Sequence, residues 1–96
     1  MASINITIPK ELEDYKPEMR RFFDAMAYKL FKNAHKGKWE GMDINNLIQK
    51  LRDEVDELDT AVINDDMFDI VFEAADVANF AMMVSAVAIS SMAGER

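Results

Sequence analysis

The sequence predicts an all-α protein, an antiparallel helical bundle that is completed by oligomerisation. Apolar residues recur at spacings of three and four along three segments, which is the period of an α-helix. Only 3 glycines and 2 prolines interrupt the 96 residues, so long helices are possible. The last segment is apolar on nearly every side, and two neighbouring helices in so short a chain cannot cover it.

Composition limits the chain to one domain, 1–96, and excludes several classes of function. There are no cysteines, which excludes disulfides, thiolate metal sites and a cysteine nucleophile. A single histidine excludes a multi-histidine zinc site. The net charge of −7 argues against a nucleic-acid polymer or an anionic membrane as partner. We therefore expect a small, soluble, cytoplasmic protein.

Charge is divided unevenly along the chain. Residues 1–39 hold eight basic and five acidic side chains, a net charge of +3, whereas residues 40–96 hold three basic and thirteen acidic ones, a net charge of −10. Such a division fits a site that holds phosphates together with divalent cations. It also fits simple attraction between helices, which is the more common reason.

The first third of the chain is expected to form an N-terminal arm, 1–17, followed by a helix over 18–36. Residues 1–8 alternate apolar and polar side chains and lack the features of a signal peptide, so they predict an extended segment that ends at Pro9. Pro17 suits the first turn of a helix, where its missing N–H is not needed. The apolar residues of this helix have helical spacing: Met19, Phe22, Phe23, Met26 and Leu30.

A second helix is predicted over 43–63, with Asp43 as its N-cap. A loop bracketed by Gly37 and Gly41 precedes it. Its apolar side chains span an arc of roughly 100°, the width of a stripe that faces a core. They are Leu47, Ile48, Leu51, Val55, Leu58 and Val62.

A third helix is predicted over 67–92, with Asp66 and Asp69 in a capping arrangement at its start. Between residues 70 and 89, sixteen of twenty side chains are apolar or small. A membrane span is not expected, because two carboxylates lie in the first third of this stretch and no basic residues flank it. Other copies of the chain are expected to cover the helix, with a homotetramer favoured over a dimer.

Four carboxylates are predicted to meet between the second and third helices. Glu73 and Asp76 lie three residues apart on a strip that continues to Asn79. Buried like charges repel each other and lose hydration, so such groups persist when they are protonated, paired or bound to metal. Glu54 and Glu57 form a matching pair, which antiparallel packing would bring opposite the first.

An all-oxygen cluster of this kind favours Mg²⁺ or Mn²⁺ over zinc or copper. A ferritin-like di-iron site is a poorer fit, because it needs Glu-x-x-His motifs and the only histidine, His35, lies elsewhere. Simpler explanations stay open. Residues 53–57 have the composition of a solvated charge run, and salt bridges can hold Glu73 and Asp76.

The same carboxylates resemble the signature of a known family. Glu54-x-x-Glu57 followed by Glu73-x-x-Asp76 is similar to the paired motif of the MazG-like, all-α nucleoside triphosphate pyrophosphohydrolases. Members of this family convert a nucleoside triphosphate and water into the monophosphate and pyrophosphate. The resemblance thus implies a Mg²⁺-dependent hydrolase in which Mn²⁺ can substitute, and it implies that these four carboxylates are the metal ligands.

Two further runs extend the resemblance, which covers residues 19–90. Asn33–Trp39 and Ala75–Met83 look like the corresponding segments of short stand-alone members, often phage-encoded, including MazZ-like deoxypurine triphosphate hydrolases. The chain departs from the pattern at Asp53, where many members have a glutamate. By analogy, Glu54 or Asp53 is expected to orient the water that attacks the α-phosphorus.

The remaining candidate residues are expected to contact the substrate. Trp39 is either a stacking surface for the base or an anchor of its loop, and Asn79 meets a ligand group or a protein partner. His35 contacts a phosphate or caps the first helix, while the methionines and phenylalanines pack the core or an interface. The phosphate ligands are expected among the lysines, each of which can equally be solvated: Lys29, Lys32, Lys36 and Lys38.

Two other functions remain open beside this one. The fold can act on phosphoribosyl-ATP, as relatives do, or it can be a non-catalytic helical oligomerisation or regulatory module. The leaning to deoxypurines (dGTP or dATP) rests on the resemblance alone, because base preference depends on one or two hydrogen bonds that a sequence does not locate.

Overall fold

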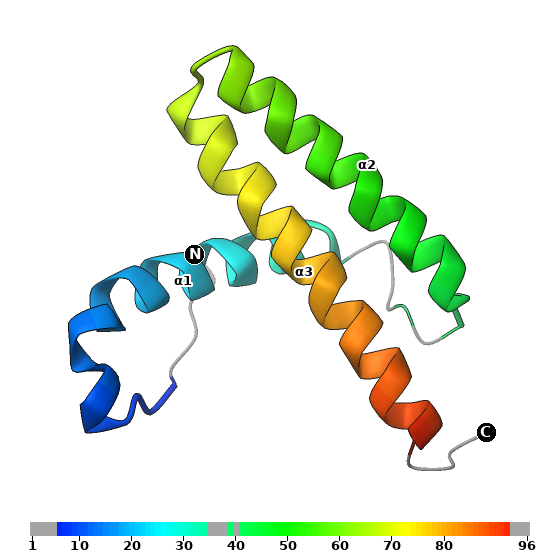
Figure 1. Cartoon of the computed structure of the whole chain (residues 1–96), viewed down its shortest axis with the longest axis horizontal. Coiled ribbons are helices and arrows are strands. Elements are labelled where there is room, and N and C mark those ends of the chain that lie inside the picture. Colours follow the sequence, from blue (N-terminus) through cyan, green and yellow to red (C-terminus); the bar gives the residue numbers. More distant parts are fainter. Residues whose placement is uncertain (1–5, 35–38, 40, 93–96) are drawn as a thin grey trace.

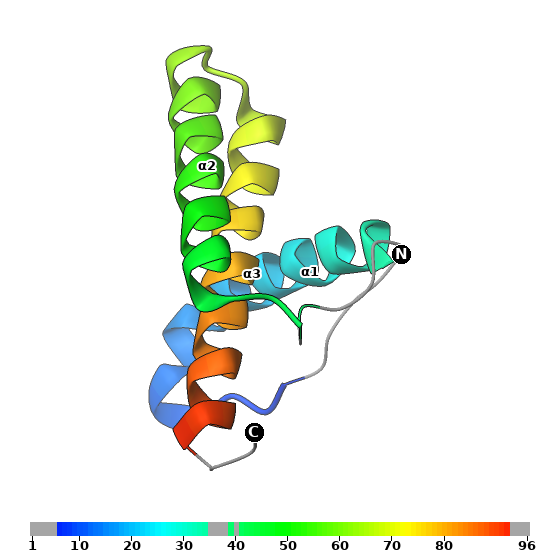
Figure 2. The same ribbon diagram turned by 90° about the vertical axis from the view of Figure 1, so that its right-hand side faces the viewer.

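The structure is a computed structural model that describes residues 6–34, 39 and 41–92. A short 3₁₀ helix, η1 (Lys10–Tyr15), precedes three α-helices: α1 (Lys16–Lys32), α2 (Ile44–Ile63) and α3 (Met67–Met92). The helices α2 and α3 form an antiparallel hairpin, and α1 crosses α3 (Figure 1, Figure 2). No strand occurs among the described residues, so the all-α prediction is confirmed.

The N-terminal arm, expected over 1–17, contains helical structure that the sequence did not predict. Residues 10–32 are helical without interruption. The N–H of Leu12 donates to the carbonyl of Pro9 at 2.9 Å, which opens η1, and η1 continues directly into α1. Acidic side chains in the first turn of η1 favour this conformation, because they interact well with the exposed N–H groups of a helix start. Pro17 lies in the first turn of α1, as predicted.

The helix α1 ends at Lys32, earlier than the predicted end at residue 36. Asn33 caps it, and both its backbone N–H and its side-chain amide donate to the carbonyl of Lys29, at 3.2 and 3.0 Å. Asparagine side chains compete in this way with the backbone for helical carbonyls, which favours a helix end. The apolar periodicity carried no sign of this local competition.

The turn between α2 and α3 combines a helix end with a helix start. Asp65 adopts a left-handed conformation with φ of 56°, and its N–H donates to Val62 at 3.1 Å. The N–H of Asp66 donates to Ala61, also at 3.1 Å, which completes the usual closing pair of a helix C-terminus. The side chain of Asp66 then accepts the N–H of Asp69 at 3.1 Å. This confirms the predicted cap of the third helix.

Asp65→Gly should raise the free energy of unfolding by about 0.5–1 kcal/mol, because glycine adopts a positive φ without steric cost. Urea unfolding measures the change. Asp59→Gly, at an exposed site inside α2, is the matched control and should lower the stability by a few tenths of a kcal/mol. A neutral or destabilising Asp65→Gly would show that this turn is not strained in solution.

The face of α2 that packs on α3 differs from the predicted stripe. Val55 and Val62 were expected in the core and are exposed, because among the described elements α3 alone packs against α2. Leu47 is fully buried and Glu54 is half-buried. The residues on the buried side repeat at alternating spacings of four and three: Leu47, Leu51, Glu54, Leu58 and Ala61.

Candidate functional site

A cavity of about 750 Å³ lies between the three α-helices and the segment before α2. This volume is within the range of small-molecule sites in proteins. Its walls are acidic on the side of α2 and α3, basic at two lysines, and apolar or aromatic elsewhere. The lining residues are Lys29, Leu30, Asn33, Ala34, Trp39, Met42, Lys50, Glu54, Glu57, Glu73, Asp76, Asn79, Phe80 and Met83.

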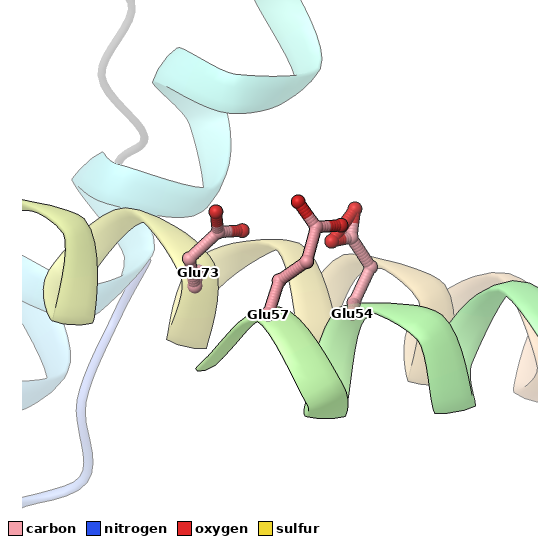
Figure 3. A group of neighbouring side chains, drawn as sticks. All are labelled: Glu54, Glu57 and Glu73. Atoms are coloured by element: carbon pink, nitrogen blue, oxygen red, sulfur yellow. The ribbon is translucent and has the colours of Figure 1, made fainter. Parts of the chain in front are cut away.

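The acidic wall is a cluster of three glutamates, Glu54, Glu57 and Glu73 (Figure 3). Each has a carboxylate oxygen within 4.8 Å of the corresponding oxygens of the other two. Figure 3 shows Glu54 and Glu57 side by side on α2, with Glu73 reaching the same side from α3. Helical spacing explains the arrangement, because residues three apart lie on one face and the antiparallel hairpin brings the two faces together.

The fourth predicted carboxylate, Asp76, lines the same cavity and is held by a lysine. The Nζ of Lys29 lies 3.2 Å from Oδ2 of Asp76, and both side chains are mostly buried. The ammonium group also lies 5.9 Å from the ring centre of Phe72, within the range of a cation–π contact. One predicted phosphate ligand is thereby fixed at the edge of the acidic cluster.

The cluster is electrostatically unfavourable when all its members are ionised. Burial, a hydrogen bond with Glu57 and the charges of Asp76, Glu57 and Glu73 raise the pKa of Glu54 from 4.5 to about 7. The pKa of Glu73 is also raised, first by burial and then by Glu57 and Asp76, while Lys29 acts in the opposite direction. Oε2 of Glu54 is buried with no hydrogen-bond partner in the described part of the chain. Such a site favours a proton or a cation.

The raised pKa of Glu54 predicts that the metal-free protein loses stability as the pH rises. The folded state binds a proton more tightly than the unfolded state, so the stabilising contribution is complete below pH 4.5 and is lost as the pH passes about 7. Thermal unfolding in a chelator, over a pH series, measures this. A divalent cation that bound this cluster would compete with the proton, so any gain in Tm that it caused should grow over the same interval. If Glu54→Gln showed the same dependence of Tm on pH as the wild type, the loss of stability could not be assigned to Glu54.

Asn79 is buried in the wall of the cavity, with only 3% of its surface exposed. Its side-chain N–H₂ donates to the carbonyl of Met26 at 3.1 Å, which ties α3 to α1. This bond also fixes the orientation of the amide, because the reversed amide would place two oxygens against each other. The side-chain oxygen is buried with no hydrogen-bond partner among the described residues. The carbonyl of Met26 is therefore the protein partner of the amide N–H₂ group, and the amide oxygen is left for another donor.

The structure brings most, but not all, of the predicted site residues together. Trp39 lines the cavity, and its carbonyl accepts the N–H of Met42, another lining residue, at 2.9 Å. Asp53 does not line the cavity; it is exposed and accepts a hydrogen bond from Gln49 at 3.0 Å. Lys32 is exposed at the end of α1 and does not line the cavity either. Three further predicted residues lie outside the described residues: His35, Lys36 and Lys38.

Several lining residues were missed or misread in the sequence. Lys50 precedes Glu54 by four residues and so lies on the same face of α2. Helical spacing alone would therefore have predicted it as a lining residue. Met83 and Phe80, which were expected only to pack the core or an interface, line the cavity instead. They follow Asn79 and Asp76 by four residues, so the strip of site residues continues further along α3 than predicted.

Comparison of the chain with protein-family models, with curated proteins and with solved structures finds no match.

Proposed function

We propose that this chain is a Mg²⁺-dependent (deoxy)nucleoside triphosphate pyrophosphohydrolase of the MazG-like, all-α kind, acting in the cytoplasm. The observation that carries the proposal is the convergence of Glu54, Glu57 and Glu73 to within 4.8 Å in a cavity that also holds basic and aromatic groups. The proposed reaction converts a triphosphate and water into the monophosphate and pyrophosphate, with a leaning to deoxypurine substrates.

The residues fit a hard divalent cation. All donors in the cluster are carboxylate oxygens, the ligand type that Mg²⁺ prefers and that Mn²⁺ also accepts. The buried, unpaired oxygen of Glu54 is better satisfied by a cation than by the neighbouring carboxylates. Glu54, Glu57 and Glu73 would hold the ion, with Asp76 as the fourth ligand once a substrate competes for Lys29. When bound, the cation supplies charge neutralisation at the phosphate oxygens.

The other walls of the cavity suit the remaining parts of a nucleotide. Lys29 and Lys50 lie beside the acidic cluster and can pair with phosphate oxygens as compact positive charges. Trp39 and Phe80 offer aromatic surface for a base, with Met83 beside them. The unpaired oxygen of Asn79 accepts a hydrogen bond from a base N–H or a sugar hydroxyl. His35, Lys36 and Lys38 remain proposed substrate contacts from the sequence.

In the proposed reaction, the oxygen of a water molecule attacks the α-phosphorus. The bond between this phosphorus and the α–β bridging oxygen breaks, and pyrophosphate leaves. Glu54 is the better candidate to orient the water and accept its proton, because it lines the cavity whereas Asp53 does not.

Product analysis over all common ribo- and deoxynucleoside triphosphates, with Mg²⁺ and with a chelator, tests the proposal. We expect monophosphate and pyrophosphate from one or a few substrates, and no turnover in the chelator. Diphosphate and phosphate as products would contradict the proposed bond cleavage. Pyrophosphate from phosphoribosyl-ATP alone would favour the related activity, and no turnover of any substrate by a folded oligomer would favour the non-catalytic module.

A further inference from the structure

One side of α3 is apolar and uncovered. Ile89 and Met92 are 59% and 84% exposed, and Val71 and Met82 are also open to solvent. With Ala78 and Ser85 they recur at intervals of three, four or seven over more than twenty residues, so they form a stripe along one side of the helix, at whose edge Ala75 is buried against the rest of the chain. Among the described residues of α3, Ala75 and Asn79 are buried within the chain, and most residues between 70 and 88 are half-buried.

The chain as a whole also exposes more surface than a compact monomer of its size. Its accessible surface is 7210 Å², whereas a monomer of 11.0 kDa exposes about 5,600 Å². Its radius of gyration is 14.8 Å, against about 12.5 Å for a compact domain of this length. The difference in surface, about 1,600 Å², exceeds the roughly 800 Å² that each partner buries in a standard interface.

The stripe lies away from the cavity. On a helical projection its centre is well over 100° from Asp76 and Glu73, so the substrate site and the stripe occupy different sides of α3. Val55 and Val62 of α2 are exposed outside the carboxylate side of that helix. The last turns of α3 extend past the first turn of α2, and no described element covers them (Figure 1).

We propose that a second copy of this chain covers the stripe, with the two α3 helices packed antiparallel about a two-fold axis near Met82. This position is the midpoint of the stripe, so Val71 of one copy lies opposite Met92 of the other, and Ala78 opposite Ser85. The small residues allow close approach of the two backbones. Each uncovered C-terminal end then reaches the exposed valines of the other copy's α2.

A second copy is a better occupant than a membrane. By length and composition α3 could cross one, but Glu73 and Asp76 lie within it, and α1 and α2 are packed against it. The helix is apolar on nearly every side, but α1 and α2 cover part of it, and the exposed side chains of the stripe lie on one side. A two-fold axis also makes the surface complementary to itself, since the same residues occur on both sides. The proposal does not depend on the chemistry of the cavity.

This dimer can be the unit of the expected tetramer. A tetramer needs a second surface on each chain, and η1 and α1 expose large apolar side chains at Leu12, Tyr15, Phe22 and Phe31. The α3 contact would join two chains, and these residues would join two dimers.

The absence of cysteine allows a direct test by cross-linking. Met82→Cys should form a disulfide-linked dimer under mild oxidation, because the two-fold axis brings the two sulfur atoms together. Ser91→Cys, exposed on a different side of α3, is the matched control and should cross-link far less. Equal cross-linking of the two variants, or none at position 82, would overturn the proposed contact.

The molar mass of the wild-type chain, measured by light scattering, should be that of a dimer or of a multiple of the dimer. Ile89→Glu should weaken the dimer at least about tenfold, because it places a charge in the contact, whereas Ser91→Glu should not. Circular dichroism shows whether both variants stay helical. A monomeric wild-type chain would overturn the proposal, and sedimentation of that monomer with phosphatidylcholine vesicles would assign the stripe to a membrane surface instead.

Discussion

Glu57→Gln should reduce pyrophosphate release at least about 100-fold, the largest effect that we expect of any single substitution. The change removes one negative charge and one anionic oxygen donor from the cluster while it keeps the shape of the side chain. Because charge neutralisation by a metal contributes several kcal/mol to a phosphoryl-transfer transition state, loss of an anionic ligand costs orders of magnitude in rate. Steady-state release of pyrophosphate with saturating Mg²⁺ measures the effect.

Asp56→Asn is the matched control for this substitution. It makes the same change of charge at the next residue of α2, on an exposed side of the helix that does not line the cavity. We expect its activity to stay within about twofold of wild type, since a single surface charge has little influence. If Glu57→Gln retained activity and Asp56→Asn lost it, the cluster would not be the reaction centre.

Glu54→Gln should have opposite effects on stability and activity. Above pH 7, Glu54 is ionised against three other carboxylates, and one of its oxygens is buried without a hydrogen-bond partner in the described residues. A neutral amide removes this repulsion and can donate to Glu57 or Glu73. We expect the metal-free variant to be more stable by up to about 1 kcal/mol, a modest value because the cavity is open to solvent.

The same variant should lose turnover, together with the rise of Tm that Mg²⁺ produces in the wild type. Thermal unfolding with a chelator and with Mg²⁺ measures both parts, and Asp59→Asn on the exposed side of α2 serves as the control for a lost surface charge. A destabilised Glu54→Gln that still responds to Mg²⁺ would mean that Glu54 has a structural role and that the cation binds elsewhere.

Local patterns predicted the parts of the fold that depend on neighbouring residues in the chain. The cap of α3 at Asp66 follows from a side chain three residues before the N–H that it accepts. The helix α2 begins after Asp43 as predicted, but the side chain of Asp43 makes no capping hydrogen bond. The end of α1 was misplaced, because it depends on a competition between the side chain and the backbone of Asn33 that apolar spacing does not contain. The helical start at Lys10 was missed for a similar reason, since residues 10–15 have no apolar stripe.

The parts of the site that depend on helical spacing were predictable from the sequence. Two carboxylate pairs with the same spacing, on helices joined by a short turn, had to come close once the hairpin formed, and Glu54, Glu57 and Glu73 do. The pairing of Lys29 with Asp76 was not predictable, because it depends on the angle at which α1 crosses α3. The exclusion of Asp53 depends on the rotation of α2 about its axis, which the packing on α3 decides.

Hydrolysis in water labelled with ¹⁸O tests the central claim most directly. The triphosphate that is cleaved fastest should yield a monophosphate carrying the label and an unlabelled pyrophosphate, because the attacking oxygen joins the α-phosphorus and the bond to the bridging oxygen breaks. This result should require Mg²⁺ and should disappear with Glu57→Gln. Label in pyrophosphate or in free phosphate, or no incorporation from any triphosphate, would contradict a pyrophosphohydrolase site at the acidic cluster.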